Sequence, residues 1–340
     1  MSDFYEAVNQ LDPNNRNMAL TVIEGEAFTE KALLSDHKMV WRTEGSSFFH
    51  NFQQELEQLD VGGLYTVGGQ RIFCELLGRE KKLVICGGGH VSVALIRMGV
   101  MTGYEITVLE DRPEFADQSR EAGADRVICE SFDSGLAQIS GDQDTFFVIA
   151  TRGHRYDQIC MAAIVRKPHA YIGMVGSRKR VAVVKEKLIA DGADPDVVGG
   201  IYSPIGLEIG AETPEEIAVA ILAEMISVRR KNRENDGYSR ALLQAILGKS
   251  ESKVLATIVI RTGSAPRKEG TKMLILPGGS CVGTIGGGSV EAEVLKKGLR
   301  MLQNNEITPQ LFHVDMSGTT AEDEGMVCSG VIDVLLEVIY

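Results

Sequence analysis

Short apolar runs alternate with amphipathic stretches between about residues 82 and 232. Each run has the length and composition of a strand buried on both faces, and the runs lie at 83–86, 106–109, 126–129, 146–150 and 171–175, with a weaker one at 201–202. After the first run, Val91, Ala94 and Met98 recur at helical spacing. Repeated strand–helix units favour a parallel sheet with helices on both faces. The pattern therefore predicts a doubly wound α/β domain, to which we assign residues 79–234.

A glycine-rich turn follows the first predicted strand and consists of Gly87, Gly88, Gly89 and His90. With Ser92 in place of the third glycine, it has the spacing of the dinucleotide-binding fingerprint of Rossmann-like domains. Glycines here let the backbone approach a phosphate, and the N-terminus of the next helix offers unpaired N–H groups. Asp111 lies 24 residues after Gly87, near the spacing of an acid that binds ribose hydroxyls. We expect this turn to bind a phosphate or a nucleotide; the alternative is that the glycines only make a tight turn.

Two further predicted strand ends carry charged side chains. The fifth strand is followed by Gly176, Ser177, Arg178, Lys179 and Arg180. Cations are unfavourable near a helix N-terminus, which suggests a bound anion there, although a solvated basic turn is an equal alternative. The fourth strand is followed by Arg152, His154 and Asp157. His154 could move a proton or bind a ligand, and binding is the commoner role for a histidine at such a position.

The two ends of the chain resemble each other. Residues 19–24 parallel 255–260, residues 31–35 parallel 272–276, and residues 68–73 parallel Ser329, Gly330 and the strand after them. The first copy lacks the glycine-rich segments of the second, and Val67 stands where the second has Cys328. We predict a degenerate copy of a small α+β module at residues 1–78 and an intact copy at residues 235–340.

The intact copy contains two glycine-rich segments and a cysteine that could carry chemistry. One is the loop 263–270, with Gly263, Ser264, Arg267 and Lys268, and the other is the turn of Gly286, Gly287, Gly288 and Ser289 before a helix. Both are candidate anion sites, with ordinary hairpin and turn chemistry as the alternative. Cys328 stands at the start of a predicted strand, where a thiol can be accessible, although most single cysteines are inert buried residues.

Composition narrows the classes of function. The 35 Lys+Arg against 47 Asp+Glu give a net charge of −12, which argues against generic binding to nucleic acid or anionic membranes. The six cysteines contain no C-x-x-C pair, which excludes a zinc ribbon or thioredoxin-type motif and indicates reduced thiols. No signal pattern opens the chain, and no apolar run approaches the roughly 20 residues of a membrane helix. We therefore expect a cytoplasmic protein of two or three domains for its 340 residues, with a homodimer as the default assembly.

Ordered motifs in the middle and at the end of the chain resemble the XdhC/CoxI family. The segments LVICGGGHVSVAL, VLEDRPEFA, ATRGHRYD, YIGMVGSRKR and SPIGLEIGAETPEEIAVAILAEM resemble its Rossmann-like domain. The segments TGSAPRKEGTKMLI, VGTIGGGSVEAEV and GMVCSG resemble its smaller domain. Together they cover most of residues 82–230 and 253–338, and the ordered set is far more specific than any single motif.

The resemblance implies an accessory factor for xanthine dehydrogenase and related molybdenum hydroxylases. Such factors bind molybdenum cofactor, as molybdopterin or its dinucleotide form, support its sulfuration and deliver it to the apo-hydroxylase; a cysteine desulfurase is then a further expected partner. The phosphate end of the cofactor would lie against Gly87–His90 and the basic segment 176–180, with Asp111, Arg112 and Arg152 in the cofactor-binding set. The metal end would lie near Gly263–Arg267, Gly286–Ser289 and Cys328.

The chain departs from the family pattern in two ways. The family usually places the small domain before the Rossmann-like one, whereas the intact copy here comes after it. The family's small domain also often reads Gly-Gly-Cys-x-Glu, whereas this chain has Ser289 at the cysteine position, so a thiol role at that point is lost. Cys328 is then the best remaining soft ligand in that domain for molybdenum or a transferred sulfur, and we count it as both catalytic and metal-ligating.

Two other functions stay open. One is an NAD(P)-dependent oxidoreductase with His154 as acid or base; Asp111 would favour NAD, and the adjacent Arg112 leaves NADP open. Only the fold-level analogy supports that activity, and a fold does not determine chemistry. The other is a scaffold that docks a hydroxylase without binding a ligand itself, against which the set of glycine-rich strand ends counts.

Overall fold

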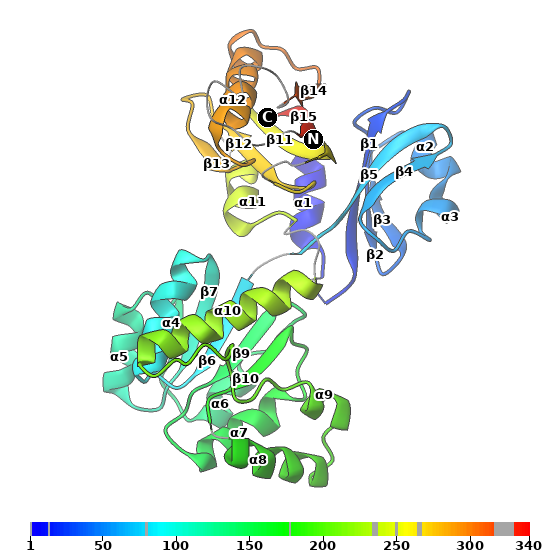
Figure 1. Cartoon of the computed structure of the whole chain (residues 1–340). Helices are drawn as coiled ribbons and strands as arrows, with labels where there is room; N and C mark the ends of the chain where they lie inside the picture. Colours follow the sequence, from blue (N-terminus) through cyan, green and yellow to red (C-terminus); the bar gives the residue numbers. More distant parts are fainter. Residues whose placement is uncertain are drawn as a thin grey trace. The chain divides into compact units, whose positions relative to one another are not determined.

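The structure, a computed structural model, describes residues 2–12, 14–78, 81–176, 178–232, 237–248, 251–263, 267–315 and 330–340. The chain divides into two compact units (Figure 1). The inserted unit comprises residues 80–232, and the flanking unit is built from residues 1–79 together with residues 233–340. The sequence pattern indicated two separate end modules, and in the structure both belong to one unit.

A five-stranded parallel sheet forms the centre of the inserted unit. Its strands are β6 (Lys81–Cys86), β7 (Tyr104–Leu109), β8 (Arg126–Ile128), β9 (Thr145–Ile149) and β10 (Tyr171–Met174), in the order β10-β9-β6-β7-β8. The helices are α4 (His90–Met101), α5 (Pro113–Glu121), α6 (Phe132–Ala137), α7 (His154–Ile164), α8 (Arg178–Ala190), α9 (Pro195–Gly199) and α10 (Pro214–Asn232). The doubly wound fold predicted from the sequence is confirmed. The weak run at 201–202 forms only an isolated bridge from Tyr202 to Gly173.

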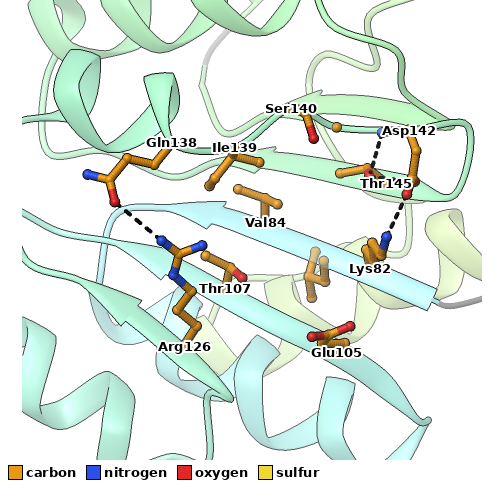
Figure 2. A pocket seen from close by; sticks show the side chains of 12 residues that line it. Lys82, Val84, Glu105, Thr107, Arg126, Gln138, Ile139, Ser140, Asp142 and Thr145 are labelled. Atoms are coloured by element: carbon orange, nitrogen blue, oxygen red, sulfur yellow. Dashed lines mark hydrogen bonds and ion pairs between the residues drawn. The ribbon is translucent and has the colours of Figure 1, made fainter. Parts of the chain in front are cut away.

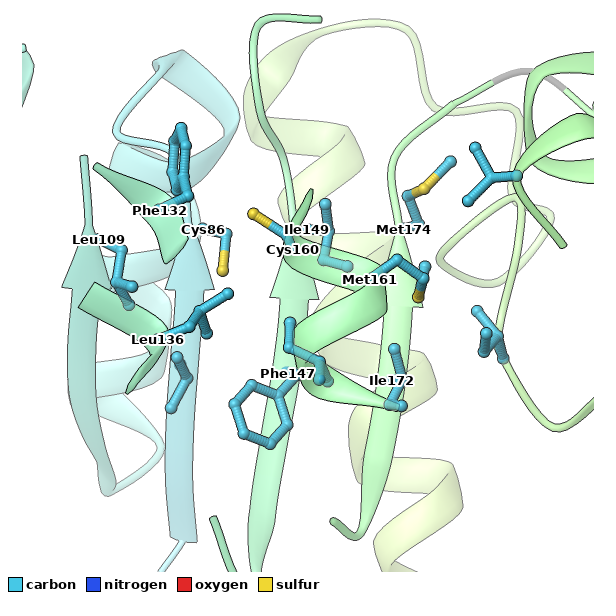
Figure 3. Close-up of a cluster of buried hydrophobic side chains, with 14 of the residues drawn as sticks. Cys86, Leu109, Phe132, Leu136, Phe147, Ile149, Cys160, Met161, Ile172 and Met174 are labelled. Atoms are coloured by element: carbon cyan, nitrogen blue, oxygen red, sulfur yellow. The ribbon is translucent and has the colours of Figure 1, made fainter. Parts of the chain in front are cut away.

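Apolar side chains on the two faces of this sheet form two separate cores. Val84 and Cys86 of β6 belong to the core on one face, which contains side chains of α6, α7, α8 and α9 (Figure 3). Leu83 and Ile85 alternate with them and belong to the other core, which contains side chains of α4 and α10. Helices thus cover both faces, which explains why the strands read as continuous apolar runs.

The flanking unit contains two antiparallel sheets. The N-terminal module (residues 2–78) has α1 (Ser2–Gln10), β1 (Asn17–Glu24), β2 (Lys31–Ser35), β3 (Lys38–Arg42), α2 (Ser47–Asn51), α3 (Gln53–Leu56), β4 (Gly63–Val67) and β5 (Gln70–Leu76). The C-terminal module (residues 237–340) has α11 (Arg240–Leu247), β11 (Lys253–Thr262), β12 (Lys272–Ile275), β13 (Cys281–Gly283), α12 (Gly288–Gln303), β14 (Gln310–Asp315) and β15 (Val331–Ile339). The strand orders, β3-β2-β1-β5-β4 and β13-β12-β11-β15-β14, are the same.

The registers of the two sheets also correspond. Thr21 pairs with Lys31 in one sheet as Thr257 pairs with Lys272 in the other. Each long strand has an irregularity at the same place, between Val22 and Glu24 in β1 and between Ile258 and Ile260 in β11. The two ends of the chain therefore form the same fold twice, as the sequence parallels suggested.

Each module has a core of its own, and the two modules share two more. The separate cores include α12 in the C-terminal module and α2 and α3 in the N-terminal one. One shared core gathers residues of α1 and α11 with strand residues from both sheets. The other contains Ile23 and Phe73 from one sheet with Val259 and Leu335 from the other. The modules thus bury apolar surface against each other.

Two buried ion pairs also join the modules. Lys31 Nζ lies 3.0 Å from Glu337 Oε2, and Lys272 Nζ lies 2.6 Å from Glu75 Oε2 and also contacts the other carboxylate oxygen of Glu75. All four side chains are almost completely buried. Because Lys31 corresponds to Lys272 and Glu75 to Glu337 in register, the two pairs are reciprocal. Burial lowers the pKa of Lys272, and the charge and hydrogen bonds of Glu75 oppose that shift.

Candidate functional site

The carboxyl edge of β6 and β9 is the topological switch point of the parallel sheet. The first strand, β6, has β7 and β8 on one side and β9 and β10 on the other, so the connections leave it in opposite directions. Ligands of open α/β sheets bind in the crevice that this reversal creates. The turn 87–90 follows β6 and the segment 151–154 follows β9. Both segments singled out from the sequence therefore lie at this edge.

Steric limits require glycine in the turn after β6. Gly87 has a φ of 112°, and a Cβ there would lie 2.4 Å from the carbonyl oxygen of Ala150. A Cβ on Gly88 would lie 2.8 Å from the carbonyl oxygen of Phe115. Gly89 is different, because no atom lies within 4 Å of its Cβ position. The turn is thus tightly packed on one side and open at Gly89, which caps α4 just before His90.

A buried carboxylate that the sequence analysis did not single out holds this turn. Glu110 is 1% exposed, and its Oε2 accepts a 2.7 Å hydrogen bond from the N–H of Gly88. Arg112 donates to the same carboxylate from its backbone N–H (3.1 Å), its Nε (2.8 Å) and its Nη2 (3.1 Å). The N–H of Gly88 is therefore already bonded within the protein. The sequence signal was available, since Glu110 is the first residue after β7 and directly precedes Asp111.

Arg152 connects the segment after β9 to the segment after β7. It binds the Asp111 carboxylate with both terminal nitrogens, at 2.8 Å for Nη2. Nη2 also donates to the hydroxyl of Tyr156 (2.7 Å), and the guanidinium lies 4.1 Å from the centre of that ring. The hydrogen bonds from Arg152 lower the pKa of Asp111 to about 2. Tyr156, a residue not singled out from the sequence, positions Arg152.

The other candidates at this edge are less completely described. His154 begins α7, and Arg178 and Lys179 begin α8, but their side chains lie outside the described part of the chain, as does Ser177. Gly176 directly precedes that gap. Asp157 is fully buried and accepts a 2.5 Å hydrogen bond from the hydroxyl of Thr151. Arg152 forms its ion pairs with Asp111 and Glu110, the two acids that follow β7.

A second carboxylate holds the glycine-rich turn of the C-terminal module. Gly286, Gly287 and Gly288 all have positive φ, a conformation that favours glycine. The Oε2 of Glu291 accepts hydrogen bonds from the N–H groups of Ile285 and Gly287, both at 3.1 Å, and from the hydroxyl of Thr284. The Thr284 hydrogen bond is the main cause of the lowered pKa of Glu291. The N–H of Gly286 donates to the hydroxyl oxygen of Thr284 at 3.1 Å, so two N–H groups of this predicted anion site, those of Gly286 and Gly287, are engaged internally.

Family comparisons match both kinds of domain. Residues 83–225 match the XdhC Rossmann domain. Residues 247–315 match the XdhC and CoxI family. Together the two matches cover more than half of the chain. The chain belongs to the XdhC/CoxI family. The resemblance based on the sequence motifs is thereby confirmed.

Individual relatives cover parts of the chain. A Bacillus subtilis protein, named as a probable subunit of xanthine dehydrogenase, is 31% identical over 160 residues, which are 47% of this chain and 46% of that protein. The uncharacterized protein YqeB of Escherichia coli is 25% identical over 206 residues, 60% of this chain and 38% of that protein. The chain thus spans less than half the length of either. A Bacillus halodurans crystal structure, described as a xanthine dehydrogenase, shares the fold at 23% identity and a TM-score of 0.52, over 68% of this chain and 65% of that one.

Two of the candidate site residues in the C-terminal module of this XdhC/CoxI chain fall outside the described residues. Cys328 and Ser264 lie outside the described residues, whereas Gly263 and the exposed Arg267 border the undescribed loop segment. Among the described cysteines, Cys281 at the start of β13 is the exposed one, and burial together with the charge of Glu291 raises its pKa. Within the described ranges, no three His, Cys, Asp or Glu side chains group as a metal site, and no helix is long and apolar enough to cross a membrane.

A polar cavity of about 190 Å³ lies at the opposite, amino edge of the Rossmann sheet (Figure 2). Both cations that line it have partners in the wall: Lys82 Nζ lies 2.6 Å from Asp142 Oδ2, and Arg126 donates to Gln138 at 3.2 Å. The cavity lies away from the glycine turn, since it is lined by residues at the starts of β6, β7, β8 and β9. We therefore place the candidate site at the carboxyl edge.

Proposed function

We propose that this chain is an accessory factor for a xanthine dehydrogenase-type molybdenum hydroxylase. It would bind molybdenum cofactor as cargo, support its sulfuration and deliver it to the apo-enzyme, with a cysteine desulfurase as a further partner and a homodimer as the working assembly. The observation that carries the proposal is the XdhC Rossmann domain with an open glycine turn at its switch point, next to an arginine. The Bacillus subtilis relative, by its name a probable part of a xanthine dehydrogenase, supports the choice of partner.

The residues at the carboxyl edge fit the phosphate end of such a cargo. Gly89 leaves open space where a side chain would stand, and the first N–H groups of α4, which starts at His90, have no partner within a helix. Arg152 adds a guanidinium, whose planar donors match phosphate oxygens. These groups would bind and orient the cargo, and the bound cofactor would supply the molybdenum chemistry to the hydroxylase. For the metal end, the expected soft ligand is Cys328.

The test is the cofactor content of protein purified anaerobically from a host that makes molybdenum cofactor. We expect molybdenum and a pterin in near-equal amounts with the wild-type chain. Gly89→Val fills the open space without a steric clash, because nothing beyond the neighbouring residues lies within 4 Å of its Cβ position. It should lower the molybdenum content and the pterin content at least tenfold. Gly199→Val is the matched control, because Gly199 in α9 is similarly open and should keep both.

Three results would contradict the proposal. The first is wild-type protein without molybdenum and pterin. The second is a Gly89→Val protein that still carries both. The third is stoichiometric NAD(H) or NADP(H) in their place, which would favour an oxidoreductase and make His154 the next residue to replace.

A further inference from the structure

The Arg152–Asp111 ion pair crosses the glycine turn. Arg152 follows β9, Asp111 follows β7, and β6 lies between these two strands in the sheet. The guanidinium therefore spans the end of β6, where Gly87–His90 form the turn. Its Nη1 also lies 3.6 Å from Glu110 Oε1, and the other oxygen of Glu110 accepts the N–H of Gly88. Arg152 thus places a cation beside the candidate phosphate site.

Among the side chains that the structure describes, Glu110, Asp111, Arg112 and Arg152 carry charge beside the turn, and they form two pairs of different character. Glu110 is 1% exposed and accepts hydrogen bonds from Arg112 and from the N–H of Gly88. The guanidinium of Arg112 also lies 3.7 Å from the centre of the Phe115 ring. Arg152 and Asp111 are 33% and 23% exposed and meet at the surface. The two arginines are about equally exposed, at 32% and 33%, so the difference lies in the carboxylates. Removing the partner of the buried Glu110 is costly, whereas Asp111 near solvent can give up its partner at small cost. The outer pair is therefore the one that a ligand can open.

We propose that Arg152 binds the phosphate of the ligand and that Asp111 competes with the ligand for it. Both terminal nitrogens of Arg152 already bind Asp111, so a phosphate ester or diphosphate must take over at least one of these donors. Tyr156 stacks on the guanidinium and accepts a hydrogen bond from it. These contacts keep the guanidinium in place while the phosphate replaces Asp111. The inference rests on the proposed phosphate-binding role of this edge, but not on the identity of the cargo.

This assignment reverses the role expected of Asp111 from its spacing. A carboxylate that accepts hydrogen bonds from ribose hydroxyls strengthens the binding of a nucleotide. A carboxylate that competes with the phosphate for Arg152 weakens that binding. The two roles therefore predict opposite signs for the same substitution. Inorganic pyrophosphate, which has no ribose, and ADP, which has both groups, separate them.

The experiment is calorimetric titration of the full chain with pyrophosphate and with ADP at constant ionic strength. Asp111→Asn should tighten the binding of both probes by roughly threefold to tenfold, because Arg152 loses its short ion pair with Asp111 and keeps only the longer one to Glu110. Arg152→Gln should weaken both by about tenfold or more. Asp117→Asn is the matched control: Asp117 pairs with Arg120 on the exposed surface of α5, so this variant changes the net charge equally and should leave both affinities within about twofold.

Several outcomes would overturn the inference. If Asp111→Asn weakens the binding of ADP and leaves that of pyrophosphate unchanged, Asp111 binds the ribose hydroxyls. If Arg152→Gln leaves both affinities unchanged, or if the wild-type chain binds neither probe at millimolar concentration, Arg152 is not a phosphate ligand. The proposed function is tested separately. If the affinities for pyrophosphate and ADP change as expected but the purified protein carries no molybdenum and pterin, the role of Arg152 stands and the proposed cargo is wrong.

Discussion

The N-terminal and C-terminal modules have the same fold but differ in what they place on it. Their strand orders, registers and strand irregularities agree, and both contribute a lysine and a glutamate to the reciprocal ion pairs. They differ after the third strand, where the C-terminal module has a glycine turn and the long helix α12 and the N-terminal module has the short α2 and α3. The surface between the modules is thus alike in both, whereas the glycine turn and the long helix α12 are confined to one.

The largest effect should come from breaking the inter-module ion pairs. Lys272→Met leaves the carboxylate of Glu75 buried without a counter-charge and should cost about 3–5 kcal/mol of the free energy of unfolding. Lys31→Met should cost less, because Lys31 contacts one oxygen of Glu337 whereas Lys272 contacts both oxygens of Glu75.

Denaturation followed by the fluorescence of Trp41, the one tryptophan of the sequence, measures this effect in the flanking unit. Adding Glu75→Leu to Lys272→Met should restore much of the loss, because it removes the unpaired charge. A double variant no more stable than Lys272→Met would show that the charge is not the cause.

An effect of similar or smaller size is expected from the shared apolar core. Phe73 and Leu335 occupy corresponding positions, opposite Thr21 and Thr257 in their sheets, and both are buried in it. We expect Phe73→Ala to cost about 3–5 kcal/mol and Leu335→Ala about 2–5 kcal/mol, measured by the same denaturation. Val40→Ala, at a half-exposed position of β3, should stay within about 0.5 kcal/mol. If Phe73→Ala and Leu335→Ala were as stable as Val40→Ala, the stability of the flanking unit would not depend on the shared apolar core.

The next effect tests an element present in one module. Gly298 lies in α12, and a Cβ there would lie 2.5 Å from Cδ1 of Ile275. Gly298→Ala should therefore cost about 1–3 kcal/mol, although alanine usually stabilises a helix relative to glycine. Ile275→Val removes that methyl group, so in its background Gly298→Ala should be close to neutral. A cost that persists in the Ile275→Val background would rule out the steric cause.

The smallest effect concerns the glycine turn of the C-terminal module. Glu291→Ala leaves the N–H groups of Ile285 and Gly287 without their acceptor and should cost about 1 kcal/mol. Amide hydrogen exchange should become faster at these two residues and stay unchanged in β1 and β11. Unchanged exchange at Ile285 and Gly287 would mean that the carboxylate does not hold the turn.

Local patterns predicted much of this fold because each was contained in a short stretch of sequence. Apolar runs marked the parallel strands, the glycines marked the turn at 87–90, and weak parallels between the ends indicated the repeated module. Contacts that depend on strand order were not accessible in this way. Asp111 and Arg152 are 41 residues apart in the sequence, and they meet because β7 and β9 flank β6 and end at the same edge of the sheet. The position of Glu110 directly after a strand was visible in the sequence, but the hydrogen bonds by which Glu110 and Glu291 hold the two glycine turns follow only from the folded geometry.

The insertion of one unit inside another has a consequence for synthesis on the ribosome. Glu75 and Lys272 are separated by 197 positions, and Lys31 and Glu337 by 306. At a synthesis rate of about 5–20 residues per second, roughly 10–40 s pass between the synthesis of Glu75 and that of Lys272. During that interval the nascent chain carries a half-interface of apolar and charged groups while the inserted unit is being made. Translation that stops early therefore leaves a surface by which chaperones and proteases can distinguish an unfinished chain.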